Sequence, residues 1–196
     1  KEYEERDLRF HTIDKENSGV SNTRNIAMKL ARGMYLQFLD SDDWITPDAT
    51  ESLVRAAVED DCDLVIADFY RVNGKHYVEK KHIKKKDVMS REEFAMEMAD
   101  DPADYYYGVM WNKLYRRSII EEHELRCDAS MNWCEDFLYN IEYFDSVRYA
   151  YIHNSESGVY QYKICDTGIT LNLKNNMAEL ERIDRLRYEE AGNFFD

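Results

Sequence analysis

The sequence predicts an α/β protein with a mixed, mostly parallel sheet flanked by helices. Apolar runs of strand length recur at 34–39, 63–70 and 147–153, and segments with helical periodicity lie between them. The first run, a helix of about a dozen residues and the second run form a βαβ unit, which favours parallel strands covered by helices. A chain of 196 residues is long enough for one well-buried core.

The composition argues against several classes of function. The chain is acidic, with 34% charged residues and a formal net charge of -14, which argues against nucleic acid as a partner. Most of the carboxylates are interpreted as a solvated surface. No run approaches the roughly 18 uninterrupted apolar residues of a membrane helix, so we expect a soluble, cytoplasmic protein.

The cysteines match neither the spacing of a zinc site nor a dense disulfide framework, so we expect reduced, packed thiols. They are Cys62, Cys127, Cys134 and Cys165.

In the first half of the chain, residues 11–33 predict a short strand, a loop and a helix. The strand 34–39 follows and ends in an acidic turn. Thr46 then suits a helix cap and Pro47 the first helical position, so a second helix is expected before the strand 63–70.

In the second half, residues 71–86 alternate polar and apolar side chains around Asn73 and Gly74, which predicts an exposed hairpin. Ser90 and Glu93 predict a capping box at the start of the next helix.

The remaining pattern is less regular. An aromatic segment, 105–120, leads into a short helix, and residues 135–144 predict another. The runs 147–153 and 159–164 are expected to pair with each other as strands. From residue 173 onward the pattern predicts a charged amphipathic helix. Its apolar side carries Met177, Leu180, Ile183 and Leu186.

The sharpest chemical feature is the acidic turn Asp40-Ser41-Asp42-Asp43 at the end of a buried strand. In open α/β sheets, ligands bind beyond the carboxyl ends of strands. Asp40 and Asp42 can aim oxygens at one hard cation, Mg²⁺ or Mn²⁺, which would also bind phosphate oxygens. The alternative is an Asx turn or a helix cap that uses one carboxylate and leaves the others solvated.

Residues 16–49, ENSGVSNTRNIAMKLARGMYLQFLDSDDWITPDA, resemble the central block of the family 2 glycosyltransferases without a gap. The resemblance implies a Rossmann-like GT-A fold in which Asp40 and Asp42 hold the metal and the nucleotide diphosphate. It also implies that Arg24 lies near the nucleotide, helped by the loop from Asn17 to Gly19. The alternative is that Arg24 only anchors the start of its helix.

Residues 131–144, MNWCEDFLYNIEYF, resemble the second acidic signature of that family. The resemblance implies that Asp136 is the general base that takes the proton of the acceptor hydroxyl, while Glu135 positions the acceptor or the base. Trp133 would lie on the acceptor side. The alternative is that both carboxylates simply complement the positive end of a helix dipole.

Two further segments resemble parts of the family. In VMWNKLYRRSII, Trp111 and Lys113 would shape the acceptor side, although a tryptophan among apolar residues is also a core residue. In VYQYKICDTGIT, Lys163 would contact the diphosphate, and the alternative is a solvated lysine. His153 is a candidate third metal ligand.

The resemblance implies transfer of a sugar from a nucleoside diphosphate donor to the hydroxyl of a saccharide or lipid-linked acceptor, with inversion, in the synthesis of cell-surface polysaccharide or glycolipid. Two alternatives remain. One is a non-catalytic binding or assembly module with the same fold. The other is a metal-dependent phosphotransferase, which leaves Glu135 and Asp136 unexplained.

On this basis residues 1–172 form a partial GT-A glycosyltransferase domain and residues 173–196 a C-terminal amphipathic helix. The family's first strand and its acidic D-D-G-S loop, which hold the nucleobase and ribose, are not found in this sequence. We therefore expect a sheet without its first strands. We also expect little activity from this chain alone, unless a second copy covers the gap in a homodimer.

Basic residues crowd the second half of the predicted hairpin. They are Lys80, Lys81, Lys84, Lys85 and Lys86. They form either a solvated face or a patch for peripheral contact with an anionic membrane. The family's acceptors would place the enzyme in the cytoplasm at the inner face of the membrane.

Overall fold

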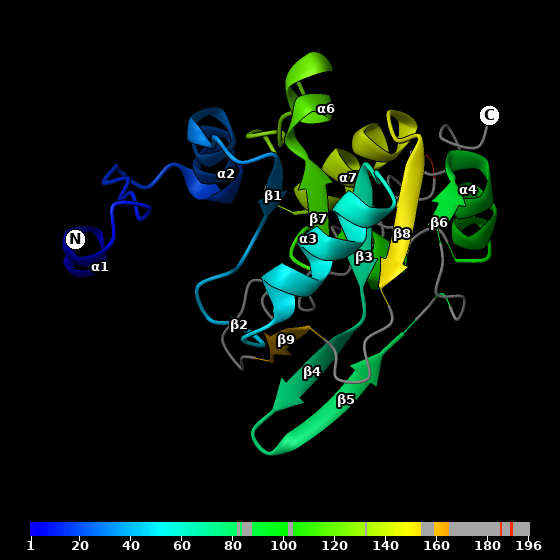
Figure 1. Cartoon of the computed structure of the whole chain (residues 1–196), viewed down its shortest axis with the longest axis horizontal. Helices are drawn as coiled ribbons and strands as arrows, with labels where there is room; N and C mark the ends of the chain where they lie inside the picture. The colour runs from blue at the N-terminus through cyan, green and yellow to red at the C-terminus, as the bar shows by residue number, and fades with distance from the viewer. Residues whose placement is uncertain are drawn as a thin grey trace.

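The structure is a computed structural model that describes residues 1–81, 83, 88–101, 104–131, 133–153, 159–164, 185 and 189. The described residues form two sheets with helices around them (Figure 1). The predicted helix at 173–196 lies outside the described residues, apart from Arg185 and Glu189, which have helical geometry.

The larger sheet has five strands in the order β1-β7-β3-β8-β6. They are β1 (Tyr35–Gln37), β7 (Lys113–Arg116), β3 (Leu64–Ala67), β8 (Tyr149–His153) and β6 (Val88–Ser90). β3 pairs in parallel with β8, whereas β7 is antiparallel to both β1 and β3, and β6 is antiparallel to β8. The sheet is therefore mixed, and β1, β3 and β8 run in one direction.

The predicted βαβ unit forms, but its two strands are not hydrogen-bonded neighbours. The strand β7, which comes much later in the chain, lies between β1 and β3. This insertion could not be read from the two apolar runs, because periodicity reports which residues are buried and not which strand lies beside them.

The described part of the chain has seven helices. They are α1 (Glu2–Arg6), α2 (Gly19–Leu30), α3 (Ala49–Glu59), α4 (Arg91–Ala99), α5 (Tyr105–Gly108), α6 (Arg117–Glu122) and α7 (Glu135–Asp145). Figure 1 shows α3 in front of the larger sheet and α7 behind it.

Both faces of β3 are buried, as its continuous apolar sequence predicts. Val65 and Ala67 belong to the hydrophobic cluster that includes Leu53 of α3. Leu64 and Ile66 belong to the cluster on the other face, which includes Phe144 of α7. Because side chains alternate along a strand, one short strand joins the two halves of the core.

The smaller sheet has four strands in the order β2-β9-β4-β5. They are β2 (Trp44–Ile45), β9 (Tyr160–Lys163), β4 (Phe69–Asn73) and β5 (His76–Lys80). The apolar run 63–70 thus contributes to both sheets, since the chain leaves β3 and enters β4 at Asp68.

The prediction that 147–153 pairs with 159–164 is wrong. β8 pairs with β3, and β9 pairs with β4 and β2. The physical reason is that β3 and β4 together offer two successive edges, so β8 and β9 each find a parallel partner there instead of each other.

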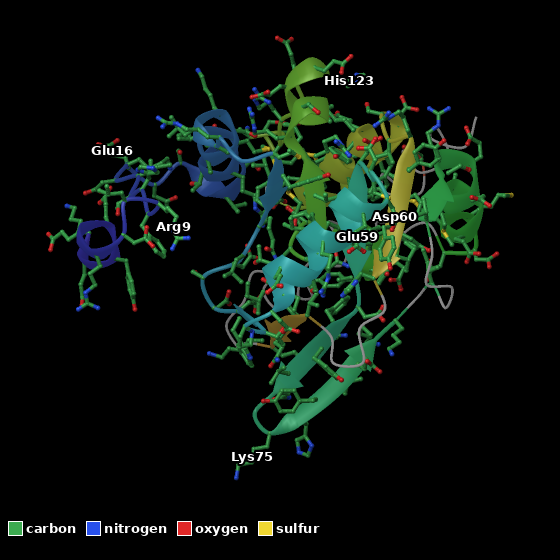
Figure 2. All side chains as sticks on the ribbon, in the orientation of Figure 1. Arg9, Glu16, Glu59, Asp60, Lys75 and His123 are labelled. Carbon is green, nitrogen blue, oxygen red and sulfur yellow. The ribbon has the colours of Figure 1, made fainter. Side chains whose placement is uncertain are left out.

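The hairpin prediction is confirmed. β4 and β5 are antiparallel around Asn73 and Gly74, and Gly74 has φ of +57°, which favours glycine. Every residue of β5 is exposed. Figure 2 shows Lys75 at the tip of the hairpin, away from the larger sheet.

Several helix starts follow local sequence rules. Ser90 and Glu93 form the predicted capping box of α4. The helix expected at Thr46 and Pro47 begins slightly later, at Ala49, and Thr46 instead closes a turn with its carbonyl oxygen. The short strand expected within 11–33 is not formed, whereas the helix in that segment is α2.

Two further expectations concern thiols and membrane helices. Cys62, Cys127 and Cys134 are free thiols, and Cys165 lies outside the described residues. Among the residues that the structure describes, no helix has both the length and the apolar character needed to cross a membrane.

Candidate active site

The acidic turn lies where the chain passes from the larger sheet to the smaller one. β1 ends at Gln37, β2 begins at Trp44, and the backbone N–H of Asp43 donates to the carbonyl oxygen of Asp40 at 3.2 Å. The turn is therefore beyond the carboxyl end of a strand, as the sequence predicts.

Arg24, on α2, joins this turn to the second acidic signature. Its Nη2 donates to Asp40 Oδ1 at 3.2 Å, and its Nη1 donates to Glu135 Oε1 at 3.4 Å and to Asp136 Oδ1. The side chain is only 11% exposed. Although burial acts to lower the pKa of Arg24, the carboxylates of Asp136, Asp40 and Glu135 raise it above its usual value.

Neighbouring contacts fix α2 in this position. Asn25 exchanges two hydrogen bonds of 2.8 Å with the backbone of Cys127. Met28 is buried and accepts a hydrogen bond from the Tyr139 hydroxyl of α7 at 3.4 Å. Asn25 was not predicted from the sequence, although it follows Arg24 directly in the chain and holds the same helix in place.

Asp136 begins α7 together with Glu135, so both carboxylates lie in the first turn of a helix. Asp136 Oδ2 accepts a hydrogen bond of 3.4 Å from the backbone N–H of Met110. Burial raises the pKa of Asp136 to about 7, against the opposing effect of Arg24 and with a further increase from Glu135. A carboxyl group with this pKa suits proton transfer near neutral pH.

Asp43 has a structural role that was not predicted from the sequence. Its Oδ2 accepts from the Tyr160 hydroxyl at 2.6 Å, and its Oδ1 accepts from the backbone N–H of Lys163 at 2.7 Å. The Tyr160 hydroxyl also accepts from the backbone N–H of Asp40 at 3.2 Å. One aspartate thus fixes the shape of the turn, in line with the structural alternative for this loop.

The donor set of the turn fits a cation that is shared with a substrate. Asp40 is partly exposed and Asp42 is exposed. No group of three His, Cys, Asp or Glu side chains among the described residues is placed to bind a metal. Mg²⁺ commonly takes one or two carboxylates and completes its shell with water and phosphate oxygens. The prediction of His153 as a third ligand is wrong, because His153 forms no such group with Asp40 and Asp42.

Two predicted acceptor residues lie in the core. Lys113 is fully buried, and its Nζ donates to the carbonyl oxygen of Tyr106 at 3.0 Å and to Asn112 Oδ1 at 2.8 Å. Burial lowers the pKa of Lys113 well below its usual value. Trp111 is 3% exposed and stacks on Tyr160. The ammonium group of Lys113 can be buried because it donates to carbonyl oxygens of α5 and of the turn after it. The prediction that Trp111 and Lys113 contact an acceptor is therefore corrected: both residues pack in the core.

The other predicted residues lie at the surface or near it. Gly19 has φ of +83°, and its backbone N–H donates to Asn17 Oδ1 at 3.1 Å. This left-handed turn requires glycine and begins α2. Trp133 is half-buried and Lys163 is exposed. Their contacts with acceptor and diphosphate stay predictions.

Comparison with known proteins shows the family of this chain. The family model described as "Glycosyl transferase family 2" matches residues 1–124. The putative glycosyltransferase EpsH of Bacillus subtilis is 32% identical over 94% of this chain and 57% of its own length. Glycosyltransferase GlyA of Streptococcus pneumoniae is 30% identical over 84% of this chain and 24% of its own length.

Solved structures give the same fold. Staphylococcus aureus TarS, residues 1–349 in complex with UDP-GlcNAc, superposes with a TM-score of 0.64 at 18% identity, over 80% of this chain and 42% of that one. The fold is thus the α/β fold of GT-A enzymes. The chain belongs to glycosyl transferase family 2. It spans about half, or less, of the length of the relatives named above.

Proposed function

We propose that this chain carries the catalytic part of a glycosyltransferase that moves a sugar from a nucleoside diphosphate donor to a hydroxyl acceptor. The convergence of Asp40, Glu135 and Asp136 on Arg24 is the observation that carries this proposal. It brings the predicted diphosphate site and the predicted base to one place. TarS was solved in complex with UDP-GlcNAc, which supports a nucleotide-sugar donor.

The proposed chemistry is a single displacement. Asp136 takes the proton of the acceptor hydroxyl, and the acceptor oxygen forms a bond to the anomeric carbon as the bond to the diphosphate oxygen breaks. The diphosphate leaves with the bonding electron pair. Attack from the side opposite the leaving group inverts the anomeric configuration, and a product that keeps the donor's configuration would contradict this route.

Asp40 and Asp42 are the residues that would hold Mn²⁺ or Mg²⁺. The cation, when bound, offsets the negative charge of the diphosphate. Arg24 has a positioning role, since its guanidinium orients Asp40 and Asp136 toward each other. Glu135, the third partner of Arg24, helps to keep Asp136 in its position.

The acceptor is proposed to be a saccharide polymer or a lipid-linked saccharide in cell-surface polymer synthesis. Two relatives support this class: TarP of Staphylococcus aureus is a poly(ribitol-phosphate) beta-N-acetylglucosaminyltransferase, as is TarS. Such acceptors agree with a location at the inner face of the membrane, which stays a prediction, as does a homodimer.

Calorimetric titration with a panel of nucleoside diphosphates, with and without Mn²⁺, tests the proposal. We expect binding that requires the cation and that chelation by EDTA removes. Asp42→Asn should remove the metal-linked part of binding, whereas Asp48→Asn, a matched exposed change at the start of α3, should not.

The alternatives give different results in the same experiments. A non-catalytic module would show no metal-linked binding of any nucleotide. A phosphotransferase would release inorganic phosphate from a nucleotide-sugar and transfer no glycosyl group. Either outcome would contradict the proposed function.

A further inference from the structure

A cavity of about 230 Å³ lies beside the smaller sheet, and the proposed chemistry does not use it. Phe69, Arg71 and Lys80 of the β4–β5 hairpin line it, together with Lys81 directly after β5. The other lining residues are Asp104, Tyr105 and Tyr106, at the start of α5.

The register of the sheet places the hairpin residues on one face. Phe69 lies directly opposite Lys80 on β5 and opposite Tyr160 on β9, and Arg71 lies opposite Tyr162. Side chains that are directly opposite on neighbouring strands point to the same face. Two cationic side chains therefore share a face with three aromatic rings.

The aromatic rings form a continuous wall that reaches the acidic turn. Tyr105 contacts Tyr162 and Trp111, with ring centroids 5.9 Å and 6.0 Å apart. Trp111 stacks on Tyr160 with ring centroids 4.3 Å apart, and the Tyr160 hydroxyl donates a hydrogen bond to Asp43. The Tyr105 side chain is 45% exposed, so its ring offers an apolar surface next to the cavity.

The side chains of Arg71 and Lys80 are not held in ion pairs, although the carboxylate of Asp104 also lines the cavity. Within the described ranges, no Asp or Glu side chain forms an ion pair with Arg71 or Lys80. Lys81, by contrast, contacts Glu79 at 3.1 Å. Asp104 uses its Oδ1 to accept from the backbone N–H of Tyr106 at 2.6 Å. In a chain of net charge -14, Arg71 and Lys80 beside a cavity favour an anionic ligand.

The cavity also lies near the proposed base. α5 has four residues, so it spans only about 6 Å at the usual helical rise. At its end, the Gly108 carbonyl oxygen accepts from Asn140 of α7 at 2.9 Å, and the Met110 N–H donates to Asp136. One short segment, residues 104–110, therefore both lines the cavity and contacts the proposed base.

We propose that this cavity is an acceptor subsite for an anionic saccharide unit, one that carries a phosphate or a carboxylate group. Arg71 and Lys80 bind the anionic group, and the Tyr105 ring contacts the sugar. This assignment rests on the proposed function, because it describes part of the acceptor.

The test compares two double variants of the full chain. Arg71→Gln with Lys80→Gln removes the two cavity cations that form no ion pair and leaves Lys81, which pairs with Glu79. Arg55→Gln with Lys75→Gln removes one arginine and one lysine elsewhere, on α3 and at the hairpin tip, and so matches the change in charge. All four positions are exposed, and far-UV circular dichroism checks the fold of both variants.

Binding is measured by NMR titration of ¹⁵N-labelled protein with glucose 6-phosphate, glucuronate and glucose. We expect glucose 6-phosphate or glucuronate to shift the amides of the β4–β5 hairpin and α5, and to bind about tenfold more weakly to the cavity variant, as expected for loss of two charge-assisted contacts. The control variant should bind like the wild type. Tighter binding of glucose 6-phosphate would indicate a phosphate group on the acceptor, and tighter binding of glucuronate would indicate a carboxylate group.

Three outcomes overturn the subsite: equal binding of glucose and the charged sugars, equal loss in both variants, or shifts confined to other surfaces. Titration of the same samples with UDP and Mn²⁺ separates this proposal from the proposed function. If UDP binds with Mn²⁺ but no charged sugar binds, only the subsite is contradicted. If a charged sugar binds but UDP does not, the proposed function is contradicted and the cavity remains an anion-binding site. If the double variant is unfolded, Lys80→Gln alone serves, with Lys75→Gln as its control.

Discussion

Arg24 is the residue on which the site depends most. A guanidinium group offers several donors in a rigid planar arrangement, so one side chain can bind carboxylates on two sides. The three carboxylates around it would repel one another without this cation, since two of them are largely buried: Glu135 and Asp136 are 11% and 19% exposed.

Arg24→Ala should therefore lower the free energy of unfolding by about 3–5 kcal/mol, the usual cost of leaving a buried charge without its partner. Arg24→Lys should recover only part of this loss, because a lysine cannot reproduce the forked contacts. Urea denaturation measures both. Arg32→Ala, at an exposed position just after α2, is the control, and equal effects at 24 and 32 would contradict the role of Arg24.

The pKa of Asp136 leads to a prediction about the rate of transfer. Burial raises this pKa to about 7, so the carboxyl group is protonated below that pH and becomes a base above it. The rate of sugar transfer by the full-length protein should rise as the pH increases through about 7 and then level off. Asp136→Asn should lower the rate by about 10²–10⁴ while metal-linked UDP binding persists. A variant that keeps the wild-type rate would exclude Asp136 as the base.

Among the elements, β9 decides the shape of the acidic turn. Its residue Tyr160 is 1% exposed and binds both Asp43 and the backbone of Asp40. β9 is held in turn by β2 and β4, one strand on each side. The turn therefore depends on a strand that is far from it in the sequence.

Tyr160→Phe keeps the ring that stacks on Trp111 but removes the hydroxyl group. We expect the free energy of unfolding to fall by about 1–2 kcal/mol, because two hydrogen bonds in a largely buried position are lost. Metal-linked UDP binding should weaken as well. Tyr77→Phe on exposed β5 is the matched control for both measurements. If the two variants behave alike, the hydroxyl of Tyr160 does not hold the turn.

At the scale of the whole molecule, the two sheets meet at Asp68, between β3 and β4. Its side chain is fully buried, and neither carboxyl oxygen has a hydrogen-bond partner among the described residues. The ammonium group of Lys81 lies 4.0 Å away. Burial raises the pKa of Asp68 to about 7, although Lys81 opposes this effect.

This raised pKa makes the stability of the fold depend on pH. The unfolded chain loses the Asp68 proton near the ordinary pKa of about 4, and the folded chain keeps it up to about pH 7. The stability contributed by the protonated group is thus complete below pH 4 and is lost as the pH rises to 7.

Asp68→Asn, which cannot ionise, should be similar to the wild type at pH 4 and more stable by about 1–3 kcal/mol at pH 8. Urea denaturation at the two pH values measures the difference. Asp60→Asn, at the exposed end of α3, is the control. A difference that does not change with pH would show that Asp68 ionises freely in the folded state.

Local patterns predicted the elements of this molecule well. The capping box at Ser90, the hairpin at Gly74 and the buried strand β3 each depend on residues that are close in the sequence. The turn Asp40–Asp43 was predicted in the same way. Its place after a strand follows from the apolar run that precedes it.

Long-range contacts were predicted less well. Sequence patterns paired 147–153 with 159–164 because the two runs are adjacent, whereas β3 and β4 provide the partners of both. Lys113 and Trp111 were assigned to the acceptor because their segment resembles part of the family. Their burial depends on carbonyl oxygens and rings of other elements, which no local pattern reveals.

The sequence by itself indicated which carboxylates to consider. Asp40 and Asp42 follow a buried strand, and Asp136 lies in a segment that resembles the second acidic signature of the family. Only the tertiary structure decided that Asp40 and Asp136 meet, and that Arg24 holds both of them. The reason is physical: helix and strand patterns arise from neighbours in the chain, while the meeting of α2, β1 and α7 depends on how their apolar faces pack together.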